Sequence, residues 1–147
     1  MVSTHIDAVR IEQAIMAAER ETSGELRVSV APFFWGSVRA MAERAFARLG
    51  MADARDRNAV LFLVVPRRRR FVVLGDVGIH ERVGQPGWDS VAREMEARCR
   101  AVDLTTAIEH GIRLVGVHLS RHFPPRPGDQ NELPDEVDLP TKPNHND

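Results

Sequence analysis

Three carboxylates stand at the ends of predicted strands, where loops begin or end. Glu25 opens one apolar segment, Asp56 comes just before a second, and Asp76 comes just after a third. Carboxylate and amide oxygens are the ligands that the hard cations Ca²⁺ and Mg²⁺ prefer. If the fold brings these three side chains together, they could bind one divalent cation. The residues that could complete such a binding site lie nearby in the sequence: Ser23, Gly24, Asn58, Gly75, Gly78 and His80.

The same residue types also have an ordinary structural use. Aspartate, asparagine, serine and glycine make turns and cap helices. On this interpretation the acids point apart, and each contacts a backbone amide or pairs with Arg57. The residues alone leave both interpretations open.

No segment of the sequence is a self-sufficient catalytic motif. Cys99 has no arginine six residues further on, and no Asp-x-Asp motif follows a predicted strand. Hydrolysis of a phosphate ester would therefore need water activated by a bound metal. The catalytic residues of any such reaction are unknown, and His80 is a candidate only for donating a proton.

Two other patterns could bind a ligand. His118 and His122 lie four residues apart on a predicted helix, which could direct both rings at a zinc ion or simply at solvent. The arginines at residues 67–70 and the aromatic residues 33–35 should lie at the same end of the sheet, an arrangement that could bind nucleic acid. The predicted domain is only mildly basic, however, so we expect no DNA or RNA partner.

Hydrophobic periodicity predicts the elements that must position these residues. Apolar residues recur at helical spacing in some segments and form strand-like runs in others. The run from Ala59 to Val65 is apolar on both faces, which is typical of a central strand covered on two sides. The predicted helices span residues 4–22, 37–49, 88–100 and 105–122, and the predicted strands span residues 25–30, 59–65 and 71–74.

The order of these elements predicts an α/β fold: a small mixed β-sheet with helices on both faces, that is, an α/β/α sandwich. A strand, a helix and a strand in succession form a right-handed crossover between parallel strands. The arginine-rich turn then returns the third strand antiparallel to the second. This topology brings Glu25, Asn58 and Asp76 to one end of the sheet although they are far apart in the sequence.

Composition divides the chain into one domain, residues 1–123, and a proline-rich acidic tail, residues 124–147. The 147 residues are 43% hydrophobic and 28% charged, which is ordinary for a globular protein. The tail holds six of the nine prolines and six acids, and we expect it to be disordered because it can bury little apolar area. No apolar run approaches the roughly 18 residues of a membrane span, and the N-terminal helix is amphipathic rather than signal-like. We therefore expect no membrane insertion and a cytoplasmic location.

Three short blocks of the sequence resemble the signature of a known family. They are ETSGELRV at residues 21–28, RNAVL at residues 57–61 and GDVGI at residues 75–79. In order and spacing they are similar to the TPM domain family, named after a thylakoid lumen protein, a photosystem repair protein and a receptor-associated worm protein. The absence of a leader segment makes the chain resemble a cytoplasmic bacterial member. The sequence differs from the family pattern at Ala59, where glycine is common, and at His80, where glutamate is common.

The resemblance implies a function as well as a fold. It implies an α/β/α sandwich, calcium binding and weak acid phosphatase activity, as in plant relatives, and partners of the membrane-associated LemA-like type. The leading prediction is a protein-interaction module of unknown specific function that also binds Ca²⁺ or Mg²⁺, with a LemA-like partner. The alternative is a weak metal-assisted acid phosphatase that holds its cation with Glu25, Asp56 and Asp76.

Overall fold

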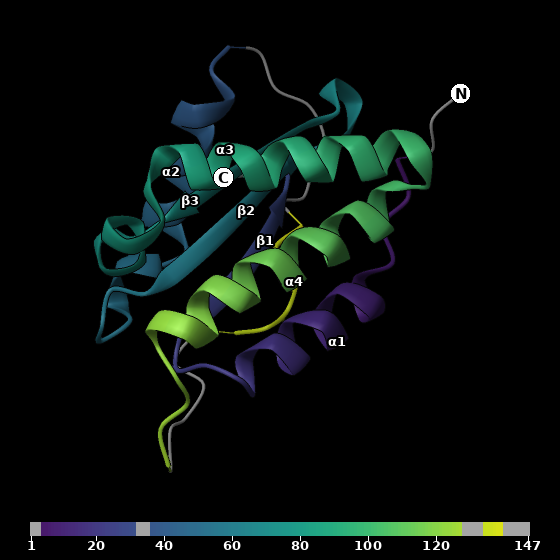
Figure 1. Cartoon of the computed structure of the whole chain (residues 1–147). Helices are drawn as coiled ribbons and strands as arrows, with labels where there is room; N and C mark the ends of the chain where they lie inside the picture. The colour runs from purple at the N-terminus through teal and green to yellow at the C-terminus, as the bar shows by residue number, and fades with distance from the viewer. Residues whose placement is uncertain (1–3, 32–35, 128–133, 140–147) are drawn as a thin grey trace, which may run out of the picture.

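The structure is a computed structural model that describes residues 4–31, 36–127 and 134–139. Helices and strands are interleaved in the first part of the chain, and the chain then forms two long helices (Figure 1). In chain order they are α1 Ala8–Glu19, β1 Glu25–Val30, α2 Val38–Arg48, β2 Ala59–Val65, β3 Arg70–Gly75, α3 Val77–Ala101 and α4 Leu104–His122. Two short 3₁₀ helices, η1 Met51–Asp53 and η2 Pro66–Arg68, precede β2 and β3.

The sheet has the mixed topology that the element order predicts. Its strand order is β1-β2-β3, with β1 parallel to β2 and β2 antiparallel to β3. All residues of β2 are buried, as expected for an apolar central strand. The register places Glu25 opposite Ala59 and Val60 opposite Gly75, so the start of β1 and the end of β3 share one end of the sheet.

Helices cover both faces of the sheet. Helices α1, α3 and α4 lie on one face and α2 lies on the other (Figure 1). Alternate strand residues point to opposite faces: Phe62 and Val73 join the large core with α1, α3 and α4, whereas Leu63 and Val65 pack with Ala42 of α2. The predicted α/β/α sandwich is confirmed.

Helix α3 begins earlier than the sequence pattern predicts. It starts at Val77 rather than at Trp88 and bends at Gly84, where φ is +75°. The Asp76 side chain accepts a hydrogen bond from the Val77 amide at 2.8 Å and so caps the helix at this earlier start. Pro86 follows the bend at Gly84, so glycine and proline produce a kink within one long helix.

Part of the tail that was predicted to be disordered, residues 134–139, lies along the free edge of β1. Asp138 exchanges two backbone hydrogen bonds of 2.9 Å with Val28 and Val30, and it bridges to β1 in the parallel sense. Its carboxylate accepts from the Ser29 hydroxyl at 2.8 Å and pairs with Arg48 at 2.9 Å. Val137 also packs against the large core, so hydrogen bonds and apolar contact together hold this stretch, for which the composition predicts disorder. The rest of the tail beyond residue 127 lies outside the described residues.

Candidate functional site

The strand register gathers predicted site residues at one end of the sheet, here called the sheet end. Glu25 opens β1, and its amide donates to the Asn58 carbonyl at 3.4 Å. The Asp76 amide donates to the Ala59 carbonyl at 2.9 Å. Glu25 thus begins β1, Asn58 immediately precedes β2 and Asp76 immediately follows β3, as the topology predicts. All three residues are buried.

Asp76 is held by protein groups on both of its carboxylate oxygens. Arg57 donates from Nε to Oδ2 at 2.5 Å and from Nη2 to Oδ1 at 2.9 Å. Oδ1 also accepts from the Val77 amide, and the side chain of Asp76 is only 5% exposed. The hydrogen bond and charge of Asp76 raise the pKa of the Arg57 guanidinium, so Arg57 stays charged at ordinary pH.

Asp56 is directed to a different partner. Its carboxylate forms an ion pair with Arg126, which lies just beyond the end of α4. Asp76 therefore matches the second interpretation of the sequence, because it caps a backbone amide and pairs with Arg57, whereas the arginine that pairs with Asp56 is Arg126, which that interpretation did not name.

The acids that do act on one another are Glu19, Glu25 and Asp135. Burial, then a hydrogen bond with Asp135 and the charge of Glu25, raise the pKa of Glu19 to about 10, although the Leu26 amide opposes this shift by donating to Glu19 at 2.9 Å. Glu19 is therefore protonated at neutral pH and donates its proton toward Asp135. The sequence pattern did not reveal this cluster, because Glu19 sits in the last turn of α1 and Asp135 belongs to the segment predicted to be disordered.

The sheet end as it stands does not fit a metal ion. Within the described residues, no group of three or more His, Cys, Asp and Glu side chains is arranged to hold one. Arginines occupy the oxygens of Asp56 and Asp76 that a cation would need. Binding of Ca²⁺ or Mg²⁺ at Glu25, Asp56 and Asp76 stays a prediction.

The signature glycines allow close contacts that a side chain would block. A Cβ at Gly78 would lie 2.3 Å from the carbonyl oxygen of Asp56, and one at Gly75 would lie 2.4 Å from Cζ2 of Trp88. A Cβ at Gly24 would lie 2.7 Å from Cδ2 of Leu119. These contacts explain the glycines by packing, without a ligand.

Ser23 and His80 also have structural partners. The Ser23 amide donates to the Phe123 carbonyl at 2.9 Å, which ties the start of β1 to the end of α4. The Nε1 of Trp88 donates to Nδ1 of His80 at 2.9 Å, across the bend of α3. His80 thus uses one ring nitrogen to hold a buried tryptophan.

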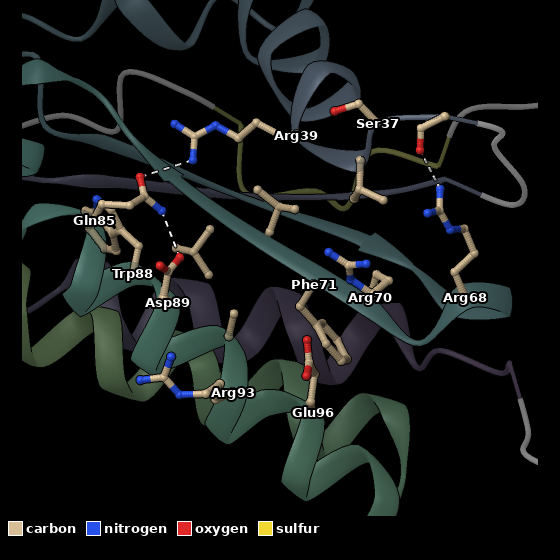
Figure 2. A pocket seen from close by; sticks show the side chains of 15 residues that line it. Ser37, Arg39, Arg68, Arg70, Phe71, Gln85, Trp88, Asp89, Arg93 and Glu96 are labelled. Carbon is tan, nitrogen blue, oxygen red and sulfur yellow. Dashed lines mark hydrogen bonds between the residues drawn. The ribbon is translucent and has the colours of Figure 1, made fainter.

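A cavity of about 490 Å³ lies elsewhere, beside β3 and between α2 and α3. Figure 2 shows arginines from several different elements around it, together with Asp89 and Glu96 of α3. We call this cavity the arginine groove; its arginines are Arg39 of α2, Arg68 of η2, Arg70 of β3 and Arg93 of α3. The sequence pattern singled out Arg68 and Arg70 within a basic turn, but it could not place Arg39 and Arg93 beside them.

Some of these arginines are already engaged. Arg39 contacts Gln85 at 3.1 Å and Glu43 at 3.3 Å, and Arg68 donates to the Gly36 carbonyl at 2.9 Å. Within the part of the chain that the structure describes, the side chains of Arg70 and Arg93 have no hydrogen-bond or ion-pair partner. Both side chains are exposed. The arginine groove therefore offers uncompensated positive charge.

The fold and the signature contacts at the sheet end define a TPM domain. The sequence matches the TPM domain family over residues 4–117, and the chain belongs to this family. The BA42 protein of the psychrophilic bacterium Bizionia argentinensis is similar in structure, with a TM-score of 0.83 and 29% identity over 92% of this chain and 95% of that protein. The N-terminal domain of a protein from P. gingivalis shares the fold, with a TM-score of 0.68 and 13% identity over 80% and 78% of the two chains.

Two further findings concern curated relatives and the apolar character of the helices. No curated protein matches the sequence. Among the described residues, no helix combines the length and the apolar character that crossing a bilayer requires.

Proposed function

We propose that this TPM domain is a protein-interaction module that binds its partner in the arginine groove. The observation that supports this proposal is the pair Arg70 and Arg93, which line a cavity of about 490 Å³ and have no acidic partner in the described residues. A cavity of this size is within the range of protein binding sites. Charges left uncompensated beside such a cavity attract a partner of opposite sign.

The contacts at the sheet end favour a structural role over catalysis. Two of the three acids that a metal-assisted phosphatase would use, Asp76 and Asp56, are paired with Arg57 and Arg126, and the signature glycines are in packing contact. The proposal therefore assigns a structural role to the sheet end and the binding role to the arginine groove.

Site-specific photo-crosslinking in cells that express the full chain tests this proposal. A photoreactive amino acid in place of Asp89 lies in the groove, whereas the same group in place of Arg121 lies on the exposed end of α4. We expect a crosslinked adduct with another protein from position 89 and none from position 121. Equal adducts at both positions, or none at either, would contradict the proposal.

An assay of phosphate-ester hydrolysis separates the enzyme alternative from this proposal. We expect no turnover by the full chain with magnesium, manganese or calcium. Turnover that disappears in Asp76→Ala but persists in Glu12→Gln would favour the phosphatase instead.

A further inference from the structure

We propose that the arginine groove binds an extended acidic peptide segment, which adds to the sheet as a strand beside β3. This inference rests on the proposed function and names the chemistry of the partner. It combines three observations: an open strand edge, an excess of positive charge, and an equivalent contact elsewhere in the same molecule.

The edge of β3 that faces the groove carries backbone groups not used by the sheet. The Asp76 amide donates to the Ala59 carbonyl at 2.9 Å, which fixes the hydrogen-bonded pairs between β2 and β3. Such pairs alternate along an antiparallel ladder, so Val72 bonds to β2 while the amides and carbonyls of Phe71 and Val73 turn outward. Within the described residues β3 is the last strand, and Phe71 and Val73 line the groove. Phe71 and Val73 are only 4% and 2% exposed, so an added strand must first displace the long side chains that line the groove. Once those side chains move, the outward backbone groups can accept a strand.

Charge selects an acidic segment for this edge. The groove is lined by four arginines against two carboxylates, those of Asp89 and Glu96. Asp89 accepts from Gln85 at 2.8 Å, and within the described residues neither carboxylate forms an ion pair with Arg70 or Arg93, so the arginines stay in excess. Side chains alternate along an added strand, and those that point toward the arginines would be favourable as aspartate or glutamate.

The opposite edge of the sheet already binds an acidic segment in this way. Asp138 forms two backbone hydrogen bonds with β1, and its carboxylate pairs with Arg48. The same elements, an open edge and a nearby arginine, are present at β3 without an occupant among the described residues. Strand addition by an acidic segment is thus a contact that this fold already makes.

A peptide fits the groove better than a single-stranded nucleic acid. Single-stranded nucleic acids bind largely by stacking their bases on exposed aromatic rings. The aromatic residues that line the groove are buried, with Phe71 4% exposed and Trp88 1% exposed. Among the described residues, which leave out the aromatic residues 33–35, the groove therefore supplies charge and a strand edge but no exposed aromatic ring.

A fluorescent six-residue peptide of alternating glutamate and valine tests the inference on the full chain. We expect saturable binding by fluorescence anisotropy. Amide exchange measured by NMR should slow at Phe71 and Val73, whose amides point outward, and stay unchanged at Val72. The double variant Arg70→Glu, Arg93→Glu should weaken binding about tenfold or more, since two contacts become repulsive.

Matched controls separate local contacts from net charge. The variant Arg98→Glu, Arg121→Glu changes net charge equally but alters exposed arginines outside the groove, and it should keep affinity within about twofold. The same peptide methylated on alternate backbone nitrogens should bind at least about tenfold more weakly, because it cannot pair with an edge.

The outcomes distinguish this inference from the proposed function. Equal binding of the methylated peptide, or tighter binding of an oligothymidine of equal charge, would overturn strand addition. No peptide binding despite a crosslinked adduct at position 89 would overturn the inference and leave the interaction module standing. Absence of both would remove both proposals.

Discussion

The guanidinium of Arg57 and the carboxylate of Asp76 meet in a two-point contact at the sheet end, with N–O distances of 2.5 and 2.9 Å. Arg57 adopts a left-handed backbone conformation with φ of +51°, which is unfavourable for a residue with a side chain. Its carbonyl accepts from the Gly78 amide at 2.8 Å, so both its side chain and its backbone hold the start of α3. The contact ties the loop before β2 to helix α3.

This contact predicts how calcium acts at the sheet end. A cation that uses the oxygens of Asp76 must displace Arg57, so calcium should raise the melting temperature of Arg57→Gln more than that of the wild type. Thermal unfolding with and without millimolar calcium measures this rise in the wild type and in the variant. Arg98→Gln is the matched control and should respond as the wild type does. A larger rise in the wild type than in Arg57→Gln would show that the cation does not compete with this arginine.

The raised pKa of Glu19 predicts a loss of stability at alkaline pH. The pKa is about 10 in the folded protein and 4.5 for an ordinary glutamate, so the native state keeps a proton that the unfolded state releases. The contribution of Glu19 is complete below about pH 4.5 and is lost as pH rises toward about 10. Glu19→Gln keeps a neutral side chain at every pH, so its stability should fall less between about pH 6 and about pH 9.

Urea unfolding at both pH values measures this difference. Glu12→Gln removes a carboxylate from the same helix and should lose stability with pH as the wild type does. A slope in Glu19→Gln as steep as in the wild type would contradict protonation of Glu19 in the fold.

Asp138 predicts that part of the tail contributes to stability. Burial opposes ionisation of Asp138, but the hydrogen bonds from Arg48 and Ser29 outweigh it and lower the pKa of this carboxylate. Asp138→Ala should decrease the free energy of unfolding by about 1 kcal/mol at neutral pH. The difference between variant and wild type should vanish as pH falls below about 4 and through the lowered pKa, because the contribution requires the charged form.

Denaturant unfolding at neutral and acid pH checks the effect of Asp138. Glu136→Ala, which changes an exposed acid in the same stretch whose side chain has no partner among the described residues, serves as the control. Equal stability of Asp138→Ala and the wild type at neutral pH would show that the segment is not held by this side chain.

Gly78 predicts a large steric effect. The added Cβ of Gly78→Ala would lie 2.3 Å from a backbone oxygen of Asp56, which cannot move without shifting the loop. Overpacking of this kind costs about 1 to 3 kcal/mol. At Gly116 in α4 the nearest atom would be Cβ of Ala18 at 3.3 Å, so Gly116→Ala should be close to neutral. Similar melting temperatures for the two variants would contradict the close contact.

The sequence predicts the sheet well because its signals are local. The apolar run of β2 and the crossover rule suffice to place Glu25 beside Asn58 and the end of β3. These local signals do not predict where the side chains of Asp76 and Asp56 point. Ion pairs with Arg57 and Arg126 determine those directions, and pairing between distant residues leaves no periodic pattern in the sequence.

The arginine groove was beyond sequence reasoning for a similar reason. Arg39 and Arg93 belong to helices on opposite faces of the sheet, and only the assembled fold brings both to the edge of β3. The acids around Glu19 were missed because Asp135 belongs to a segment whose composition predicts disorder. Composition measures apolar burial and does not account for the hydrogen bonds of Asp138.

The two edges of this sheet differ in a way that bears on solubility. An exposed strand edge can pair with the same edge of another copy and start aggregation. Here the Asp138 segment covers part of the β1 edge, while arginines flank β3. Two copies that met through β3 would bring like charges together, and this repulsion protects the edge from self-pairing without covering it. The same arginines thus act as gatekeepers, which keep copies of the protein from aggregating through this edge of the sheet.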